Sequence, residues 1–409
     1  MKGKEMNSWI ISAVTMGICL FQGPATAKSP GDTIPAPPGL IWKQTFSAPI
    51  NSSPVVDGDL LFFGGFDSSF YSLQLSDGTE LWHYKTGGEI RSTPAIFDTT
   101  VIFSSGDGSV YCLAKRSGAL CWKFATKGER KQDFADYYQS SPVISGGNLF
   151  FGSGDGNIYA IKPTDGSLIW QFATGGVVHA TPAVDDDELF VGSFDGHFYA
   201  LSVESGALLW KFKSVGQEWF PRGDFQGSPT AGGGVVVVGA RDYNLYVLDG
   251  ARGFCRWNKR FARGWALANK IVDSVLYTGT SDDRLLIAME LASGRELWRT
   301  NLHFNIFGGL AIDGGIGYVG TLLGKLYAVD LKSGAERWAF ATDGYNANHL
   351  KYFKADDSFR DDIFEIVKSD EAFIDVEHEI GAIFSTPALA GDRLVFTSTD
   401  GSVYCLKIR

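Results

Sequence analysis

The chain has 409 residues and a net charge of −10 at pH 7, and only 20% of its residues are charged. A protein this acidic is a poor binder of polyanions, because neutralising phosphates requires clustered Lys and Arg, so we expect no nucleic-acid partner. The 50 glycines and the 14% of Phe, Tyr and Trp are typical of short aromatic-rich strands joined by tight turns. This composition excludes a largely disordered chain.

The N-terminal residues read as a targeting segment. Lys2 and Lys4 precede an apolar run over 9–21, and a small-x-small step over 25–27 follows. These are the three parts of a secretory signal peptide, which we predict over 1–27 and which indicates a periplasmic or secreted protein. Prolines over 28–39 predict an extended linker. No later stretch is long and apolar enough to predict a transmembrane segment in the mature chain.

The rest of the chain is repetitive. Eight tryptophans recur in one context at spacings of 40 to 48 residues: Trp42, Trp82, Trp122, Trp170, Trp210, Trp257, Trp298 and Trp338. In its fullest form the unit continues from Trp through a Ser/Thr-Pro step, a β-rich run, an Asp-Gly turn and another strand to a Ser-Gly or Asp-Gly turn. This is four short strands per unit, and a single such unit cannot bury both of its faces.

The repeats predict an all-β, eight-bladed β-propeller of four-stranded blades over 40–409. The first strand, over 40–46, is an isolated outer strand, and the last, over 402–406, is the third strand of a blade. We therefore expect the N-terminal strand to pair with the C-terminal blade, which closes the ring and leaves no open edge between its ends.

The repeat motif, Asp-Gly-x-x-Tyr-Ala-Leu-x-x-x-(Ser/Asp)-Gly-x-x-x-Trp, resembles that of the pyrroloquinoline-quinone-like β-propeller family. The resemblance covers 40–409 and is strongest in copies two to four, whereas copies six and seven carry Asp283-Arg284 and Leu323-Gly324 at the turn. It implies the propeller fold. It also implies two kinds of function, because the family contains quinoprotein dehydrogenases and non-catalytic members such as the propeller subunit of the outer-membrane β-barrel assembly machine.

The non-catalytic kind fits the sequence better. The quinoprotein enzymes carry two adjacent cysteines over the quinone, and this chain has no adjacent Cys pair. We therefore expect no catalytic residue and no cofactor, with pyrroloquinoline quinone and calcium as the alternative. The six histidines show no metal-ligand spacing, so no metal site is predicted.

Three insertions distinguish the repeats. The interval from the repeat Trp to the next Pro position is 12 residues in five repeats, but it lengthens from Trp122 to Pro142, from Trp210 to Pro229 and from Trp338 to Pro387. All three insertions fall in the loop between an outer strand and the next inner strand, so they share one rim. The longest, over 343–382, is expected to be partly helical, because Phe359, Ile363, Ile366 and Val367 form a helical stripe.

The insertions carry aromatic and Arg side chains of the kind enriched at interface hot spots. The predicted partner-binding residues are Arg130, Tyr137, Tyr138, Trp219, Phe220, Arg222, Tyr345, His349 and Tyr352. They favour a protein or peptide partner, such as an envelope complex that assembles outer-membrane proteins. Two alternatives stay open: the aromatics pack the insertions onto the propeller, or they bind carbohydrate.

The residues three before each Pro position define a ring at the channel mouth. Five blades in succession place polar residues there, namely Asn51, Arg91, Gln139, His179 and Gln226, and three place apolar ones, namely Ala266, Phe307 and Phe384. A polar arc that faces an apolar arc favours a small ligand, with a quinoprotein-like oxidoreductase as one form of this alternative function. A water-filled mouth without a ligand is the other interpretation.

Two cysteines lie on neighbouring predicted strands. If Ala114 faces Ala119 across the turn, Cys112 faces Cys121. Opposed cross-strand residues are close enough for a disulfide, and a secreted protein meets an oxidising environment. The sequence therefore predicts a Cys112–Cys121 disulfide.

Overall fold

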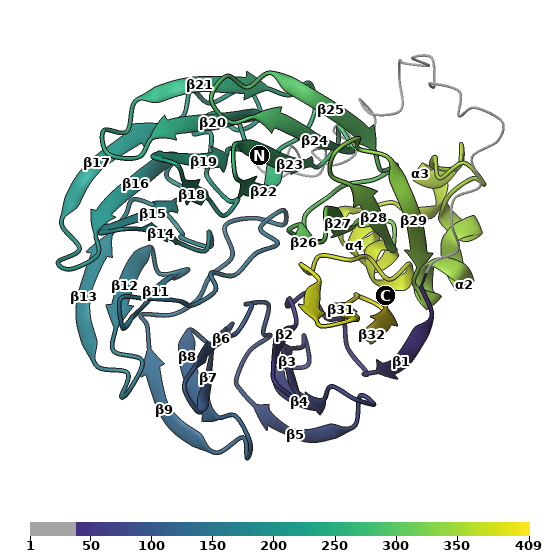
Figure 1. The fold of residues 1–409 in the computed structure, drawn as a ribbon, viewed down its shortest axis with the longest axis horizontal. Helices are drawn as coiled ribbons and strands as arrows, with labels where there is room; N and C mark the ends of the chain where they lie inside the picture. The colour runs from purple at the N-terminus through teal and green to yellow at the C-terminus, as the bar shows by residue number, and fades with distance from the viewer. Residues whose placement is uncertain (1–37) are drawn as a thin grey trace, which may run out of the picture.

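The computed structural model describes residues 38–409, which form a closed ring of eight four-stranded antiparallel sheets (Figure 1). The predicted eight-bladed β-propeller is confirmed. Strand β1 (Leu40–Thr45) pairs with β32 (Ser402–Lys407), so the N-terminal strand completes the C-terminal blade as expected. The predicted signal peptide and most of the predicted linker lie outside the described residues. None of the helices within 38–409 has the length and apolarity needed to cross a membrane.

Each blade is a meander that runs from the channel outward. The first four blades contain β2 (Val55–Asp57), β3 (Leu60–Gly64), β4 (Ser69–Gln74) and β5 (Glu80–Lys85); β6 (Ala95–Phe97), β7 (Thr100–Ser105), β8 (Ser109–Ala114) and β9 (Leu120–Ala125); β10 (Val143–Ser145), β11 (Asn148–Gly152), β12 (Asn157–Ile161) and β13 (Leu168–Ala173); and β14 (Ala183–Asp185), β15 (Glu188–Gly192), β16 (His197–Ser202) and β17 (Leu208–Lys213).

The second half of the ring repeats this order. Its blades contain β18 (Thr230–Gly232), β19 (Val235–Gly239), β20 (Asn244–Asp249) and β21 (Cys255–Arg260); β22 (Ala266–Val272), β23 (Val275–Thr280), β24 (Leu285–Glu290) and β25 (Glu296–Asn301); β26 (Ala311–Asp313), β27 (Ile316–Gly320), β28 (Lys325–Asp330) and β29 (Glu336–Ala341); and β30 (Ala388–Ala390), β31 (Arg393–Thr397) and β32, with β1 outermost.

In the described chain, seven of the eight repeat tryptophans bond one blade to the next. Trp170 donates its indole N–H to the carbonyl of Val203 at 2.9 Å, and its ring covers Gly206, where an added Cβ would come within 2.6 Å of the indole. Gly206 has a positive φ of 69°, so the turn needs glycine for both its backbone and its space. Equivalent indole bonds come from Trp42, Trp82, Trp122, Trp210, Trp257 and Trp298.

Removing one of these indole bonds is expected to weaken one blade junction. We predict that Trp170→Phe lowers the free energy of unfolding by about 1 kcal/mol more than Trp338→Phe, because a net hydrogen bond of this kind contributes about that much. Trp338 is the matched control, since within 38–409 its indole N–H shows no such bond. Urea denaturation of both variants measures the difference, and equal losses would contradict the role given to the bond.

The aspartate of the repeat motif ties the turn to the third strand. Asp155 accepts the hydroxyl of Tyr159 at 2.6 Å and the backbone N–H groups of Asn157 and Lys127. The same Tyr–Asp bond recurs between Tyr71 and Asp67, Tyr111 and Asp107, Tyr199 and Asp195, and Tyr246 and Asp242. These Tyr–Asp hydrogen bonds therefore stabilise the turns on one rim of the ring.

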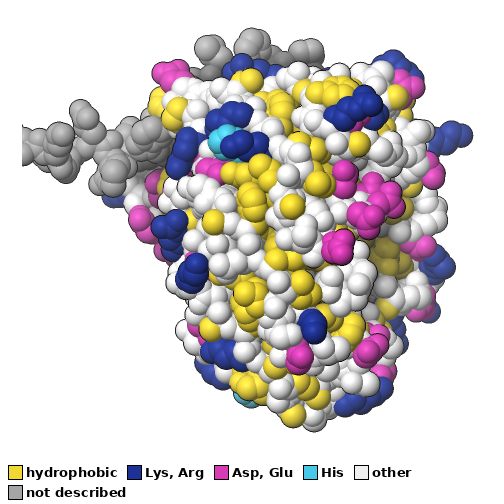
Figure 2. Space-filling view, turned by 90° about the vertical axis from the view of Figure 1, so that its left-hand side faces the viewer, with side chains coloured by type: hydrophobic (Ala, Val, Ile, Leu, Met, Phe, Trp, Pro, Cys, Tyr) yellow, Lys and Arg dark blue, Asp and Glu magenta, His cyan; other side chains and the backbone are white. Residues whose placement is uncertain are grey.

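The outer strands leave an apolar surface on the circumference of the ring. Leu168 and Ile169 in β13 and Leu208 and Leu209 in β17 are all exposed. Figure 2 looks onto this side of the molecule and shows hydrophobic side chains gathered along its middle.

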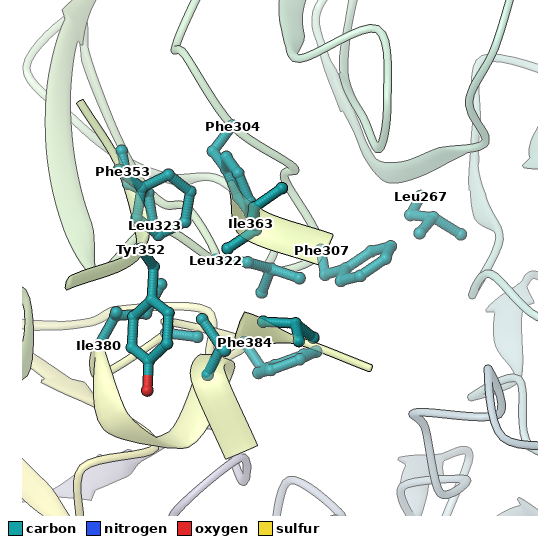
Figure 3. Packing of buried hydrophobic residues seen from close by; sticks show 13 residues of the cluster. Leu267, Phe304, Phe307, Leu322, Leu323, Tyr352, Phe353, Ile363, Ile380 and Phe384 are labelled. Atoms are coloured by element: carbon teal, nitrogen blue, oxygen red, sulfur yellow. The ribbon is translucent and has the colours of Figure 1, made fainter. Parts of the chain in front are cut away.

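Helices occur in the longest insertion: α2 (Asp343–Tyr352), α3 (Ile363–Ile366) and α4 (Asp370–Glu379). The expected stripe is wrong in extent, because α3 has only four residues and Phe359 lies outside it, in a short β-bridge with Phe353. Apolar side chains of this insertion, such as Tyr352, Ile363 and Ile380, pack with Phe304 and Phe307 of the propeller in one buried cluster (Figure 3). The insertion is therefore part of the core.

The predicted facing of Cys112 and Cys121 is wrong. The bond between Ala114 and Ala119 forms as expected, but a bulge follows it, so Leu113 faces Leu120 and Cys112 faces Trp122. Cys121 is the extra residue of the bulge. Both residues are free cysteines in the structure, Cys112 buried and Cys121 exposed.

The two thiols are expected to differ in reactivity. Burial raises the pKa of Cys112 to about 11, so only about one molecule in a thousand carries its thiolate at pH 8. We predict that a maleimide labels Cys121 in the folded protein and Cys112 only after denaturation. Mass spectrometry of the labelled peptides gives the readout. Failure of Cys121 to react before reduction, followed by labelling of both residues after it, would instead indicate the disulfide.

Candidate functional site

The first insertion (126–142, between β9 and β10) crosses the channel mouth. In Figure 1 this segment runs from the edge of the ring into its centre. Its side chains reach four other blades. The polar contacts lie on the side of the polar arc, and two tyrosines reach the apolar arc. The channel mouth, which was predicted to hold a small ligand or water, is therefore covered by the chain itself.

His179 holds the insertion from the fourth blade. Its Nδ1 lies 2.8 Å from both oxygens of Asp136, and its Nε2 lies 2.5 Å from Glu129. The imidazole is fully buried. Burial alone would lower the pKa of His179, but Asp136 and Glu129 outweigh it and raise the pKa. The two carboxylates thus favour a charged imidazolium that donates a hydrogen bond to each of them.

Arg241, from the turn between β19 and β20, is the second anchor. Its guanidinium donates to both oxygens of Asp133, at 2.6 and 3.1 Å, to the carbonyl of Ala135 at 2.9 Å and to the Gln226 side chain. Only 1% of Arg241 is exposed. This forked geometry is specific to arginine, and it fixes the middle of the insertion over the channel.

Three rings surround the guanidinium of Arg241. Its central carbon lies 4.8 Å from the ring centroid of Phe194, 5.3 Å from that of Phe220 and 5.1 Å from that of Trp265. Such cation–π contacts stabilise a desolvated guanidinium. Phe220 belongs to the second insertion (214–229, between β17 and β18), so Arg241 links the first two insertions.

Arg91 and Gln139 close the polar arc. Arg91 donates its guanidinium N–H to the carbonyl of Asp136 at 3.0 Å, and its backbone N–H to the side chain of Gln139 at 3.2 Å. Asn51 differs from the rest of the predicted ring, because its buried side-chain oxygen has no hydrogen-bond partner among the described residues. Of the five polar ring residues, Gln139 belongs to the first insertion, Arg91 and His179 bond to this insertion, and Gln226 bonds to Arg241, which also bonds to it.

Tyr137 and Tyr138 contact the apolar arc. The ring centroid of Tyr137 lies 5.2 Å from that of Phe307 and 5.6 Å from that of Phe384, and the latter two rings stack at 5.7 Å. Tyr138 donates its hydroxyl to the carbonyl of Phe307 at 2.9 Å. Both tyrosines were predicted to bind a partner, and the structure places them against the propeller's own aromatic residues.

The other predicted partner-binding residues divide between surface and interior. Arg130, Trp219 and Arg222 are exposed, whereas His349 and Tyr352 are buried in the third insertion (343–382). The hydroxyl of Tyr352 donates to Glu379 at 2.6 Å, and that of Tyr345 donates to Asp357 at 2.8 Å.

Arg241 and the acidic residues of the first insertion were not among the site residues predicted from the sequence. Arg241 could have been found by aligning the repeats on the turn aspartate, because it directly precedes that aspartate in its own repeat. The residues at that position form another ring at the mouth: Phe66, Gly106, Gly154, Phe194, Arg241, Asp282, Leu322 and Thr399. Glu129, Asp133 and Asp136 had no such signal, because the insertion has no counterpart in the other repeats.

The mouth does not fit pyrroloquinoline quinone with calcium. The cations that would hold the acidic quinone at the polar arc, Arg91, His179 and Arg241, are already bonded to the first insertion. Among residues 38–409, no group of three or more His, Cys, Asp and Glu side chains is placed to hold a metal ion.

The protein is therefore an eight-bladed β-propeller, and one of its own insertions covers the mouth of its channel. The family profile described as outer membrane protein assembly factor BamB matches residues 36–136, 106–340 and 281–357. These matches span most of the chain, so the protein belongs to this family, and the predicted membership of the pyrroloquinoline-quinone-like propellers is confirmed.

Solved structures share the fold. BamB from Moraxella catarrhalis has a TM-score of 0.64 and 18% identity, over 90% of this chain and 97% of that chain. The quinohemoprotein alcohol dehydrogenase from Comamonas testosteroni has a TM-score of 0.67 and 12% identity, over 90% of this chain and 76% of the enzyme. At such identities the similarity establishes the propeller alone.

One curated relative is an enzyme. Quinohemoprotein alcohol dehydrogenase ADH IIB from Pseudomonas putida is 40% identical over 81 residues, which span 17% of this chain and 12% of the enzyme. The chain thus matches a small part of that enzyme's length, equivalent to about two propeller repeats.

Proposed function

We propose that the chain is a non-catalytic periplasmic scaffold that binds a protein or peptide partner through its insertion rim during outer-membrane protein assembly. Membership of the assembly-factor family supports the process. The observation that carries the proposal is the covered mouth, where buried Arg241 and His179 bond to carboxylates of the first insertion. A propeller whose mouth is covered in this way presents its rim, rather than its channel, to other molecules.

The rim has side chains suited to contact. Phe134 of the first insertion, Val215 and Trp219 of the second, and Leu350 and Ile366 of the third are exposed. Large apolar side chains on loops of one face are typical of a protein-binding surface. Arg130 and Arg222 lie among them and add charged donors. The insertion rim is defined here by these seven residues.

Site-specific photo-cross-linking tests the proposal. A photoreactive phenylalanine analogue at Phe134 or Trp219, in cells that assemble outer-membrane proteins, is expected to capture a component of the assembly machinery. The matched control is the same analogue at Lys332, an exposed residue in the turn between β28 and β29 on the opposite rim. Capture from Lys332 but from neither rim position would overturn the insertion rim as the binding surface.

The alternative is a quinoprotein-like oxidoreductase, which the similarity to ADH IIB favours. It requires the first insertion to leave the mouth, because the cations of the polar arc are engaged by it. Quinone binding in the presence of calcium, lost in His179→Ala, would support this alternative against the scaffold.

A further inference from the structure

Strand β13, on the outside of the third blade, has an unusual outer edge (Figure 1). An outermost strand pairs with its blade on one side only, so it presents unpaired backbone groups to solvent. Natural proteins guard such edges with charged side chains, lysine above all, because an unguarded edge pairs with other chains. Among the outer strands within 38–409, β13 is the one whose sequence, Leu-Ile-Trp-Gln-Phe-Ala over 168–173, contains no charged residue.

The other seven outer strands are all guarded by at least one basic side chain. These residues are Lys43 in β1, Lys85 in β5, Lys123 in β9, Lys211 in β17, Lys259 in β21, Arg299 in β25 and Arg337 in β29. The repeat therefore places a charge on the outer strand as a rule, and β13 is the exception. An exception of this kind marks an edge that is suited to pairing with another chain.

The backbone of β13 has donors and acceptors free for such pairing. Strand β12 occupies its inner edge, and Thr174, the residue after β13, donates its N–H inward to the carbonyl of Gly156 at 2.9 Å. Because backbone groups alternate in direction along a strand, those of Phe172 also point inward, and those of Gln171 and Ala173 point outward. Both of these outward-pointing residues are exposed.

Apolar side chains lie on the same strand and on its neighbour. Leu168 and Ile169 of β13 are exposed, and so are Leu208 and Leu209 at the equivalent positions of β17 in the next blade. They belong to the side of the molecule on which Figure 2 shows hydrophobic side chains along the middle. Free backbone groups beside exposed apolar side chains match an extended, uncharged segment of polypeptide.

The edge of β13 is continuous with the insertion rim. Arg130, one of the rim residues, donates its guanidinium N–H to the carbonyl of Gly154 at 3.0 Å, and the carboxylate of Glu129 accepts the N–H of the same glycine at 2.9 Å. This turn also contains Gly156, which bonds to Thr174 at the end of β13. A partner bound at the insertion rim therefore lies where a segment of its chain reaches β13.

Two other occupants fit this edge less well. Residues 28–37 of the chain itself contain three prolines, and proline supplies no N–H to a strand ladder. A second copy would bring together two chains that each carry a net charge of −10 and therefore repel each other. The occupant that the edge fits best is a strand from a different protein.

We infer that the outer edge of β13 binds an extended, uncharged and apolar-rich segment of the partner protein, which adds to the four-stranded third blade as a further strand. The inference rests on the proposed function, because the segment belongs to a partner bound at the insertion rim. The backbone groups of Gln171 and Ala173 exchange hydrogen bonds with the added strand, and its apolar side chains cover Leu168 and Ile169. The main-chain bonds supply affinity, and the lack of charge in β13 selects an uncharged segment.

Binding of a defined peptide to the full mature chain tests the inference. The probe is fluorescein-labelled Gly-Thr-Val-Thr-Ile-Thr-Val-Thr-amide, and the control is the same peptide with N-methyl groups on its central residues, which cannot donate backbone hydrogen bonds. Fluorescence anisotropy is expected to show at least about 10-fold tighter binding of the unmethylated peptide, since main-chain bonds of this number are worth at least one tenfold step. Hydrogen–deuterium exchange of the wild type is expected to slow in 168–174 on binding and to stay unchanged in 80–86, at the edge of β5.

Two proline variants at equivalent positions separate the edge of β13 from the other edges. Gln171→Pro removes an outward N–H and keeps the bonds to β12, so it is expected to fold and to lose at least about 10-fold in affinity for the peptide. His83→Pro makes the same change in β5, where Thr86 donates inward to Ser68 at 2.8 Å as Thr174 does in β13, and it is expected to leave binding unchanged. Urea denaturation verifies that both variants are folded.

Three results would overturn the inference: equal affinity for both peptides, unchanged binding by folded Gln171→Pro, or no added protection of 168–174 in the wild type. A wild-type dimer in sedimentation that is lost in Gln171→Pro would also overturn it, because the edge would then belong to a second copy. The cross-linking at Phe134 and Trp219 is a separate measurement. Peptide addition without any cross-link would refute the insertion rim and retain the edge of β13, and a cross-link without peptide addition would do the reverse.

Discussion

Arg241→Ala is expected to lower the free energy of unfolding by about 3 kcal/mol and to release the first insertion from the mouth. Removing one member of a buried, hydrogen-bonded ion pair costs roughly 3–5 kcal/mol, because the remaining groups stay desolvated without a partner. The lower end applies here, since Asp133 is about a third exposed and solvent screens its charge. Buried Asp224 also lies 3.9 Å from the guanidinium and would lose this cation.

The measurement is urea denaturation combined with limited trypsin digestion at Arg130 and Lys131. Arg222→Ala is the matched control, because Arg222 also lies near Asp224, at 3.4 Å, but its side chain is half-exposed. The control is expected to change stability by less than about 0.5 kcal/mol. Arg241→Lys should not rescue the loss, since an ammonium group cannot make the forked contacts. Equal stability of the two alanine variants would contradict the anchoring role of Arg241.

His179→Gln is expected to destabilise the protein at pH 6, and to do so progressively less as the pH is raised toward 9. The folded-state pKa of His179 is raised by Asp136 and Glu129 against the effect of burial. A histidine with a raised pKa contributes stability that is complete below its unfolded pKa of about 6.5 and is lost as the pH rises through the folded pKa. Hydrogen bonds to charged groups suggest a loss of about 2 kcal/mol at pH 6.

Unfolding free energies of wild type and His179→Gln across this pH range give the readout. His83→Gln is the matched control, because His83 pairs with Glu80 at 2.7 Å on the surface, where such pairs contribute little. A wild-type advantage that stays constant from pH 6 to pH 9 would show that His179 does not hold the insertion through its charge.

The propeller could be predicted from the sequence because each of its determinants recurs locally. The Trp–Gly junction and the Asp–Tyr bond join residues at fixed spacings, as between Asp155 and Tyr159, and eight copies make the pattern readable. The closure of the ring was predicted from the same repeat pattern, which leaves a single outer strand at the start of the repeats and a blade without an outer strand at their end. A β-bulge inserts a single extra residue into a strand and leaves no mark in the strand pattern. The pairing of Cys112 with Trp122 could therefore not be predicted from the sequence.

The site was predicted only in part, because most of its contacts do not recur from repeat to repeat. Aligning the repeats found His179 and Gln226 as ring residues, but what fills the ring comes from one insertion without a copy elsewhere. Its contacts span long separations, 43 residues for Asp136 with His179 and 108 for Asp133 with Arg241. Charge and aromatic content marked the insertion as functional, but they do not say whether its side chains point outward or into the channel.

The first insertion occupies the channel mouth on both of its sides. The polar arc, for which a small ligand was one predicted occupant, instead contacts the first insertion of the same chain, where His179 bonds to Asp136 and Glu129. The apolar arc packs Tyr137 in the same way. What remains for a partner is the insertion rim.

Hydrogen–deuterium exchange with and without the outer-membrane assembly machinery tests the central claim most directly. The account predicts added protection in 126–142, 214–229 and 343–382, and none in the turns of the opposite rim, such as the one between β28 and β29. Protection confined to that opposite rim or to the outer strands would contradict binding through the insertion rim.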